Sequence, residues 1–313
     1  MKTLAIVVPC YNEEDVLLDS NNKLLNLLNK MIKNEEIDNK SFILYINDGS
    51  KDKTWDTIVK LHNESKHICG VNLAGNTGHQ NALMAGLFIA KEHADITISI
   101  DADLQDDIEV IPEMVMKNSM GCDIVYGVRK ERKTDTLFKR TTAQCFYKLM
   151  NLLGVKSVYN HADFRLMSKR AVEQLCKYRE RNLFIRGIVP LIGYQTDCVY
   201  YNRTERLAGD SKYPLGKMIN FAIDGITSFS VKPVRLVFSM GLIMLLISFG
   251  ILVYVLHSYF TGHTVEGWSS LMLSIWFIGG CILTSLGIIG EYIGKIYIEV
   301  KDRPRYNIKE TLL

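Results

Sequence analysis

Short apolar runs recur through the first 130 residues of the chain. Each run is rich in Ile, Val and Leu and apolar on both faces, which is typical of strands in a parallel sheet covered by helices. We predict strands at residues 4–9, 42–47, 68–73, 95–100 and 123–128, with helices between them at about 13–32, 52–65, 80–92 and 108–118. Repeated strand–helix–strand units predict a doubly wound, mostly parallel α/β sheet, whose ligand binds at the carboxyl ends of the strands.

The last third of the chain follows a different pattern. No Asp, Glu, Lys or Arg occurs at residues 236–265 or at residues 267–290. Each stretch supplies the roughly 20 apolar residues that a membrane-spanning helix needs. Two buried helices of a soluble domain are the alternative, which we disfavour because helices this long and apolar all round rarely fit a globular core. We therefore predict transmembrane helices at about 234–257 and 268–290, within a hairpin at residues 233–291.

Positive charges flank this hairpin, and the loop at residues 257–267 has none. They are Lys232 and Arg235 before the first helix, and Lys295, Lys301, Arg303 and Arg305 after the second. The positive-inside rule then predicts a multi-pass plasma-membrane protein with both termini in the cytosol. We expect a cytosolic N-terminal domain at residues 1–213 and a cytosolic basic tail at residues 292–313. Residues 214–232 read as an amphipathic segment on the membrane surface, with an ordinary packed helix as the alternative.

Composition argues against several other classes of protein. The formal charge of +3 is too close to zero to indicate a nucleic-acid partner. The seven cysteines are scattered, without a C-x-x-C pair or a Cys/His cluster, so neither zinc nor a disulfide framework is indicated. Reduced thiols on the cytosolic side fit this pattern. The first three residues lead directly into an apolar strand, so no cleaved signal peptide is expected.

Residues 101–106, Asp-Ala-Asp-Leu-Gln-Asp, follow a predicted buried strand and carry the strongest candidate chemistry. The carboxylates of Asp101 and Asp103 and the amide of Gln105 can converge on one hard cation. Mg²⁺ and Mn²⁺ prefer such oxygen ligands and are often shared with substrate phosphates. A metal on a diphosphate would neutralise a leaving group. The alternative is an acidic pair on a solvated loop, which would be favoured if this motif stood alone.

Three further motifs stand at the ends of predicted strands. Residues 9–14 read Pro-Cys-Tyr-Asn-Glu-Glu, residues 47–54 read Asn-Asp-Gly-Ser-Lys-Asp-Lys-Thr, and residues 75–80 read Gly-Asn-Thr-Gly-His-Gln. An aromatic ring and carboxylates at strand ends can bind a base or ribose, and backbone N–H groups at a helix start can face a phosphate. Each motif alone is equally an ordinary turn or helix cap.

Taken in this order, the motifs resemble glycosyltransferase family 2. The chain is similar in particular to the polyprenyl-phosphate glycosyltransferases, which include dolichyl-phosphate mannose synthases and bacterial bactoprenol (undecaprenyl-phosphate) glycosyltransferases. The bacterial branch is indicated by Tyr-Gly-Val-Arg at residues 126–129, Asp-Phe-Arg-Leu at 163–166, Ser-Lys-Tyr-Pro at 211–214 and the two C-terminal helices. The resemblance covers essentially the whole chain and implies a GT-A-like fold. One departure is His79, where many relatives carry lysine, and this change puts donor contacts or sugar choice in doubt.

The resemblance also implies roles for individual residues. The nucleoside would be held by Pro9, Tyr11, Glu13 and Asp48. Asp101 would contact the ribose or the metal, and Asp103 and Gln105 would bind the metal. The acceptor phosphate would be bound by Arg129 and Arg140. Arg203 and Lys212 are further candidates, for the lipid or the donor phosphate, because they come just before the predicted interfacial segment. Arginine suits phosphate because its planar fork donates two hydrogen bonds, although a surface charge is the alternative for any one of these side chains.

The catalytic group implied by the resemblance comprises Asp103, Arg129 and Asp163. A lipid monophosphate has a second pKa of about 6 and is already a nucleophile near neutral pH. Alignment and leaving-group stabilisation would therefore matter more than a base, and direct displacement would invert the anomeric centre. Asp163 is the candidate if a base or a positioning carboxylate is used, and an ion pair with Arg165 or another arginine is the equal alternative.

The resemblance thus implies a Mg²⁺- or Mn²⁺-dependent transfer of a sugar from UDP-glucose or UDP-GlcNAc to undecaprenyl phosphate, for modification of a cell-envelope glycan. A processive polysaccharide synthase is a second hypothesis, disfavoured because two spans are too few for an export channel and a Gln-x-x-Arg-Trp motif is absent. A non-catalytic membrane-anchored nucleotide-binding scaffold is a third. A homo-oligomer is expected, because Gly279, Gly280, Gly287 and Gly290 allow close packing of membrane helices.

Overall fold

The computed structural model describes residues 1–130, 161–181, 183–202, 232–261 and 267–313. These residues fall into two compact units. The first contains the N-terminal residues to 202 and the C-terminal residues from 303, and the second contains the stretch from 232 to 302. The amphipathic segment predicted at residues 214–232 lies outside the described residues except for Lys232.

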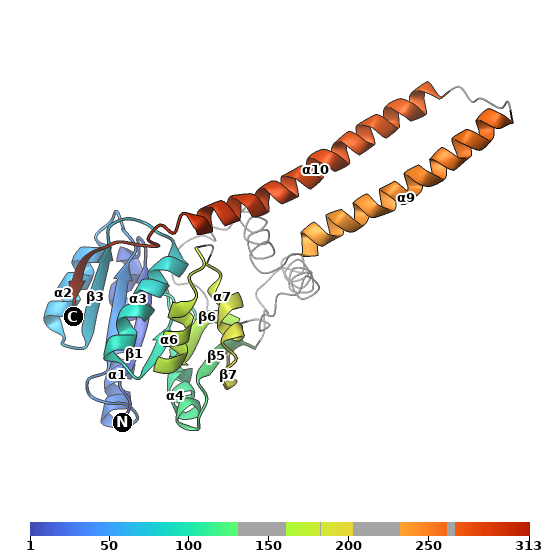
Figure 1. The fold of residues 1–313 in the computed structure, drawn as a ribbon. Coiled ribbons are helices and arrows are strands. Elements are labelled where there is room, and N and C mark those ends of the chain that lie inside the picture. The colour runs from blue at the N-terminus through green and yellow to red at the C-terminus, as the bar shows by residue number, and fades with distance from the viewer. Residues whose placement is uncertain (131–160, 182, 203–231, 262–266) are drawn as a thin grey trace. The chain divides into compact units, whose positions relative to one another are not determined.

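A mixed sheet forms the centre of the first unit (Figure 1). Its strand order is β7-β5-β6-β4-β1-β2-β3-β8. Pairs β1–β2, β1–β4, β2–β3 and β5–β7 are parallel, whereas β3–β8, β4–β6 and β5–β6 are antiparallel. The strands are β1 (Leu4–Cys10), β2 (Phe42–Asn47), β3 (Ile68–Leu73), β4 (Ile96–Ser99), β5 (Ile124–Arg129), β6 (His161–Ser168), β7 (Thr196–Tyr201) and β8 (Ile308–Leu312).

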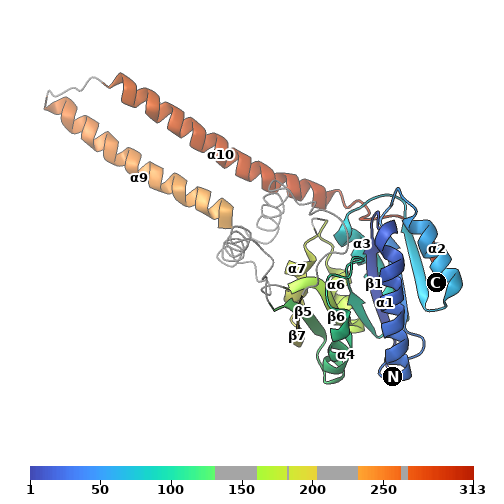
Figure 2. The ribbon, with the colours of Figure 1, turned by 180° about the vertical axis from the view of Figure 1, so that it is seen from behind.

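Helices cover both faces of this sheet, as predicted. They are α1 (Glu14–Lys33), α2 (Thr54–Glu64), α3 (His79–His93), α4 (Ile111–Ser119), α6 (Lys169–Lys177) and the short α7 (Ile185–Ile188), with 3₁₀ turns η1 (Ile108–Val110) and η2 (Val189–Ile192). Helices α3 and α6 lie on one face, and α1 and α4 lie on the other (Figures 1 and 2). Burial on both faces explains why the inner strands read as continuous apolar runs: every residue of β1, β2 and β4 is buried.

One close approach requires glycine. Gly86 of α3 faces β1 and β2, and a Cβ atom at this position would lie 2.4 Å from Cγ1 of Val7. The missing side chain lets α3 pack directly against the strands whose ends carry the candidate motifs. This contact fixes the start of α3, at Gly78 and His79, beside the carboxyl ends of β1, β2 and β4.

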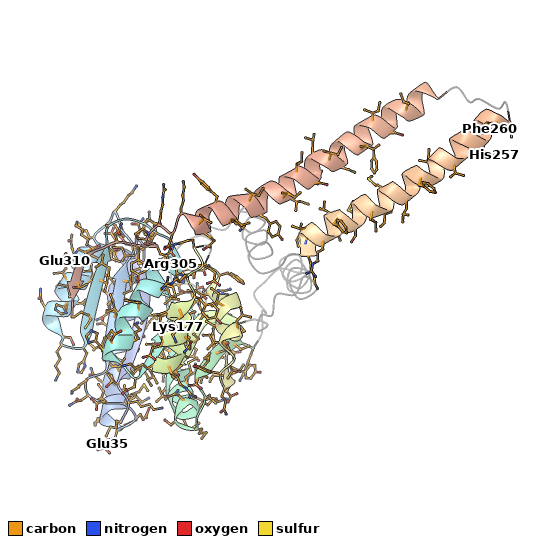
Figure 3. All side chains as sticks on the ribbon, in the orientation of Figure 1. Glu35, Lys177, His257, Phe260, Arg305 and Glu310 are labelled. Carbon is orange, nitrogen blue, oxygen red and sulfur yellow. The ribbon has the colours of Figure 1, made fainter. Side chains whose placement is uncertain are left out.

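The C-terminal strand β8 was not predicted from the sequence, which indicated only a basic tail there. Residues Ile308–Leu312 pair antiparallel with β3, and the N–H of Ala74 donates to the carbonyl of Asn307 at 2.8 Å. Nη2 of Arg305 donates to the carbonyl of Tyr178 at 2.5 Å, just after α6 (Figure 3). Chain segments far apart in the sequence therefore complete one sheet.

The second unit contains two long apolar helices, α9 (Lys232–Phe260) and α10 (Trp268–Val300). Both are long and apolar enough to cross a membrane, at Lys232–Ile251 and Phe277–Val300, and neither segment is buried in the structure. His257 and Phe260 mark the end of α9 in Figure 3. Helix α10 continues ten residues beyond the predicted end at residue 290.

Candidate active site

The acidic loop at residues 101–106 follows β4 at the carboxyl edge of the sheet. Leu104 has a φ of 42°, a left-handed conformation that turns the loop sharply. The backbone N–H of Gln105 donates to Oδ1 of Asp103 at 3.4 Å. Asp101 and Asp103 are partly exposed, whereas Gln105 and Asp106 are buried. The loop therefore offers two accessible carboxylates and holds a third inside the protein.

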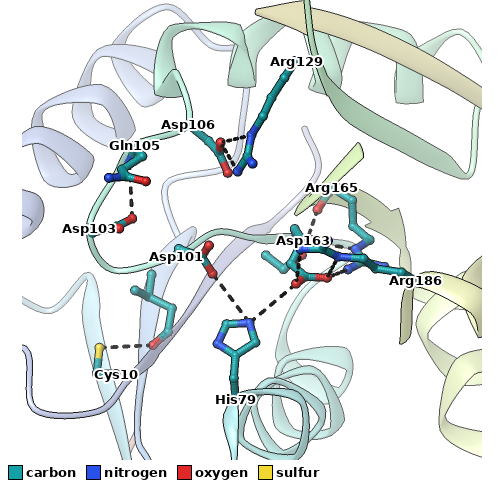
Figure 4. Close-up of polar contacts among 12 residues, drawn as sticks. Cys10, His79, Asp101, Asp103, Gln105, Asp106, Arg129, Asp163, Arg165 and Arg186 are labelled. Atoms are coloured by element: carbon teal, nitrogen blue, oxygen red, sulfur yellow. Dashed lines mark hydrogen bonds and ion pairs between the residues drawn. The ribbon is translucent and has the colours of Figure 1, made fainter. Parts of the chain in front are cut away.

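His79 joins this loop to Asp163 on β6. Its Nε2 lies 3.5 Å from Oδ1 of Asp101 and 3.9 Å from Oδ2 of Asp163 (Figure 4). Partial burial raises the pKa of Asp101; His79 opposes the shift, and the neighbouring carboxylates Asp163, Asp106 and Asp103 reinforce it. Asp101 thus lies where negative charge is concentrated and where a cation would be stabilised.

Asp163 is held by two arginines. Nη2 of Arg165 donates to its Oδ1 at 2.5 Å, while Nε and Nη2 of Arg186 donate to Oδ1 and Oδ2 at 3.2 and 3.0 Å. Burial alone would raise the pKa of Asp163, but Arg186 and Arg165 outweigh it and hold that pKa well below its usual range. The structure therefore shows the ion pair that the sequence left as the alternative to a base.

Arg129 is also paired. It ends β5, and its Nε and Nη2 donate to Oδ1 of the buried Asp106 at 3.0 and 2.8 Å. Burial disfavours the charged guanidinium, yet Asp106 and Tyr201 together raise the pKa of Arg129. The predicted phosphate ligand thus belongs to a charge-neutral pair, and its role toward an acceptor phosphate stays a prediction.

The proposed nucleoside residues gather at the ends of β1 and β2. In the β1–β2 register Pro9 pairs with Ile46 and Cys10 with Asn47, which brings residues 9–13 beside Asp48. Pro9 and Asp48 are buried, Glu13 is partly buried, and Tyr11 is 41% exposed. The exposed ring of Tyr11 is the surface on which a base could stack.

The carboxylate of Asp48, just after β2, forms hydrogen bonds with the turn that precedes α3. Oδ1 accepts from the backbone N–H and the hydroxyl of Thr77 at 2.7 and 2.9 Å, and Oδ2 accepts from the N–H of Gly78 at 2.9 Å. Both oxygens are therefore occupied by the turn that precedes α3. A contact between Asp48 and a nucleotide stays a prediction.

The acidic loop fits a hard divalent cation. In the described part of the chain no three His, Cys, Asp or Glu side chains form a ready-made metal cage. Such a cage is not needed, because Mg²⁺ is usually bound through one or two carboxylates with substrate phosphates and water completing the shell. Asp101 and Asp103 could supply that pair. Burial raises the pKa of Asp101, and the neighbouring carboxylates Asp163, Asp106 and Asp103 add to the shift, so a bound cation would offset this concentration of negative charge. Gln105 is buried beside them.

Several predicted residues lie outside the described part of the chain: Arg140, Arg203 and Lys212. Four others that the sequence analysis did not select as site residues belong to the observed cluster: His79, Asp106, Arg165 and Arg186. His79 and Asp106 stood inside motifs already noted at strand ends. Arg186 had no such signal, because only the tertiary fold brings α7 to Asp163.

Comparison with known proteins assigns both units. Residues 5–176, more than half of the chain, match glycosyl transferase family 2, and residues 232–296 match the GtrB C-terminal hairpin. The "uncharacterized glycosyltransferase YkoT" of Bacillus subtilis (strain 168) is 53% identical over 305 residues, or 97% of this chain and 90% of the relative. The "SfII prophage-derived bactoprenol glucosyl transferase" of Shigella flexneri is 42% identical over 312 residues, 98% of each chain.

Solved structures are more distant. Glucosyl-3-phosphoglycerate synthase from Mycobacterium tuberculosis, in complex with Mn²⁺, UDP-glucose and phosphoglyceric acid, aligns with 73% of this chain and 78% of its own at 17% identity and a TM-score of 0.47. The sequence matches alone are sufficient to assign the family. The chain is a glycosyltransferase with a GT-A-like mixed sheet, and it belongs to glycosyl transferase family 2.

Proposed function

We propose that this protein transfers a sugar from a nucleotide-sugar donor to a polyprenyl phosphate at the cytosolic face of a membrane. The observation that carries the proposal is similarity over 98% of the chain to a bactoprenol glucosyl transferase, including the C-terminal hairpin. The hairpin supports the proposal because an enzyme that uses a lipid acceptor must bind it at the membrane. Two apolar helices long enough to cross it support this placement.

A divalent cation, Mg²⁺ or Mn²⁺, would be held by Asp101 and Asp103, with Gln105 as a further oxygen donor. When bound, it would stabilise the negative charge that develops on the departing nucleoside diphosphate. The chain's own contribution is the acidic loop after β4, which places the two carboxylates at the sheet edge. Tyr11, Glu13 and Asp48 at the neighbouring strand ends would position the nucleoside.

The acceptor phosphate would attack the anomeric carbon directly and invert its configuration. Its dianion needs no general base near neutral pH. Asp163 is poorly suited to be that base, because Arg186 and Arg165 hold its pKa low. Its role would instead be to orient the two guanidinium groups beside Asp101, so that reacting groups meet in a fixed geometry.

The proposed arrangement in the membrane follows the charge pattern. Residues 1–213 would form the cytosolic catalytic domain, 214–232 an interfacial segment, 233–291 the transmembrane hairpin and 292–313 a cytosolic tail that ends in β8. Gly279, Gly280, Gly287 and Gly290 leave open space on α10, since a Cβ atom there would meet nothing within 4 Å. That surface supports close packing with a second copy, and hence the expected homo-oligomer.

The donor is proposed to be UDP-glucose, with UDP-GlcNAc as the alternative, and the product would serve cell-envelope glycan modification. The name of the Shigella relative points to glucose. His79, whose Nε2 lies 3.5 Å from Oδ1 of Asp101, would influence donor contacts or sugar choice, because many relatives carry lysine at this position.

A donor panel tests the proposal. Purified full-length protein would be incubated with undecaprenyl phosphate, Mg²⁺ or Mn²⁺ and one nucleotide-sugar at a time, and the lipid extract scored by mass spectrometry. We expect a single hexose on the lipid phosphate with one donor. A growing polysaccharide would instead support a processive synthase, and no product from protein that still binds UDP would favour a scaffold.

A further inference from the structure

Two polar residues, Ser20 and Asn21, lie on the buried face of α1 among Leu and Met side chains. The side chain of Asn21 is bonded within the core, where its Oδ1 accepts from the hydroxyl of Tyr45 at 3.1 Å. The hydroxyl of Ser20 instead donates to the backbone carbonyl of Ala102 at 2.6 Å, in the middle of the acidic loop. Serine within a helix often bonds to its own preceding turn, so the contact of Ser20 with the loop is a product of the tertiary fold.

The carbonyl of Ala102 lies between the two candidate metal ligands. It belongs to the planar peptide group that joins Ala102 to Asp103, and Asp101 is the residue before it. Ala102 is 4% exposed, and a buried carbonyl without a hydrogen-bond donor is costly. Because the Ser20 hydroxyl supplies a donor, it restrains the peptide plane from which Asp103 extends.

The loop depends on such restraints because its backbone is strained at Leu104. The φ of 42° at Leu104 is one that a residue with a Cβ atom keeps only when its surroundings impose it. The N–H of Leu104 donates to the carbonyl of Asp101 at 3.2 Å, and the Leu104 side chain packs against the core. The hydrogen bond from Ser20 anchors the peptide group between these two residues.

Helix α1 also begins at the predicted nucleoside motif. Its first residue, Glu14, directly follows residues 9–13 at the end of β1. The N–H of Glu13 donates to Oγ1 of Thr54 at 3.0 Å, which holds this end of the motif in place. Ser20 lies less than two helical turns further along. The same helix therefore connects the predicted nucleoside motif with the acidic loop.

We propose that Ser20 is a positioning residue of the divalent-cation site. Through the Ala102 carbonyl it holds Asp101 and Asp103 in the arrangement that binds Mg²⁺ or Mn²⁺ together with the nucleotide diphosphate. Loss of a hydrogen bond behind the ligands of a metal typically costs about 10–100-fold in metal affinity. The inference rests on the proposed function and deepens it, because it assigns a role in metal binding to a residue outside the acidic loop.

The test compares Ser20→Ala with a matched control, Ser41→Ala, in full-length protein. Alanine favours a helix, so α1 should form in Ser20→Ala. Ser41 is fully buried, and its hydroxyl also donates to a backbone carbonyl, that of Asp38, at 2.6 Å. It directly precedes β2, at the end of the sheet opposite to the acidic loop.

The measurements separate metal binding from folding. Electron paramagnetic resonance gives the affinity for Mn²⁺ in the presence of UDP. Calorimetry gives the Kd of UDP in Mn²⁺ and, separately, in EDTA. Thermal unfolding reports the stability of each variant.

We expect Ser20→Ala to weaken both Mn²⁺ binding and UDP binding in Mn²⁺ by about tenfold. UDP binding in EDTA should stay close to that of the wild type, because it does not depend on a metal held by the loop. Ser41→Ala should keep the wild-type affinities even if it unfolds at a lower temperature.

Unchanged Mn²⁺ affinity in Ser20→Ala would overturn the inference, and so would a wild-type protein that binds no Mn²⁺ with UDP. An equal loss of UDP binding in Mn²⁺ and in EDTA, or an equal loss in Ser41→Ala, would also overturn it by showing a general effect on folding. Failure of the proposed function is distinguishable: a wild-type protein that binds Mn²⁺ and UDP but transfers no sugar refutes that function, and the binding data then decide the inference alone.

Discussion

Asp163 is held by two guanidinium groups, and this changes what the residue can do. A carboxylate whose pKa lies below its usual range stays ionised through the whole neutral and mildly acidic range, so it does not titrate where the enzyme would work. The two arginines stabilise the charged form of Asp163. The carboxylate would therefore be protonated only at a pH below the ordinary pKa of an aspartate. Any pH dependence near neutrality must then come from another group.

We therefore predict that the rate of transfer falls as the pH drops through about 6, where the acceptor phosphate takes up its second proton. The same acid limb should persist in Asp163→Asn, even if that variant is slower. Initial rates at saturating donor across the pH range check this. Disappearance of the limb in the variant would identify Asp163 as the titrating base instead.

Asp103 is the residue whose loss should matter most. Asp103→Asn keeps an acceptor for the N–H of Gln105 but removes one charge from the proposed metal site. We expect transfer to fall by about 100-fold or more, because electrostatic stabilisation of a leaving group is worth several kcal/mol. Thermal unfolding should be nearly unchanged.

Asp107→Asn is the matched control for that variant. Asp107 directly follows the acidic loop and caps η1 by accepting from the N–H of Glu109 at 3.0 Å, a role that asparagine also fills. Its activity should stay close to that of the wild type. Equal losses in both variants would attribute the effect to loop structure rather than to the Asp103 charge.

The sequence predicted the acidic loop and the strand-end motifs because their residues are contiguous. It offered an ion pair of Asp163 with Arg165 as one alternative, which the structure shows, but it did not identify Arg186 or Asp106 as partners. Arg186 is more than 20 residues beyond Asp163 and lies on a helix of four residues, too short to give a periodic signal. The pairing of Arg129 with Asp106 was equally invisible, because neither residue type nor spacing specifies which of several acids a strand-end arginine will meet.

At the scale of single elements, the turn after β2 positions the motif that contains Asp48. Gly49 has a φ of 64°, and a Cβ atom there would lie 2.5 Å from the carbonyl carbon of Gly75. Both the backbone conformation and the space exclude a side chain. Since Asp48 holds Thr77 and Gly78, a displaced turn would also move the start of α3.

Gly49→Ala is therefore predicted to lower the free energy of unfolding by at least about 1–2 kcal/mol, the cost of a left-handed conformation in a residue with a Cβ atom. Gly75→Ala is the control, because a Cβ atom at Gly75 meets nothing within 4 Å. Chemical denaturation of the full-length proteins compares the two. A loss in Gly75→Ala as large as that in Gly49→Ala would refute the steric explanation.

The strands differed in how well the sequence predicted them. Strands β1 to β5 are short apolar runs in the first 130 residues and were predicted within a few residues. Strand β8 reads Ile-Lys-Glu-Thr-Leu and is almost wholly exposed, so no buried face marks it in the sequence. Strand β6 contains the charged residues Asp163 and Arg165, so its sequence does not look like that of a buried strand. The charged side chain of Arg165 can be buried there because it forms an ion pair with Asp163.

At the scale of the whole molecule, the cysteines give a natural probe of topology. Six of the seven precede residue 213 and the seventh, Cys281, lies within α10. Wild-type protein in intact cells should thus resist a membrane-impermeant maleimide. Thr261→Cys, just after α9, should be labelled from outside, and Arg303→Cys, just after α10, only once cells are permeabilised. The reverse pattern would contradict the proposed orientation.

The central claim is metal-assisted transfer of a sugar to a polyprenyl phosphate at the Asp101–Asp103 loop. The most direct test is the amount of glycosylated undecaprenyl phosphate formed by purified protein before chelation, after EDTA, and after Mg²⁺ or Mn²⁺ is restored. The account predicts product with one nucleotide-sugar, loss of at least about 100-fold on chelation, and recovery with the metal in the wild type but not in Asp103→Asn. Undiminished product in the presence of EDTA would contradict it.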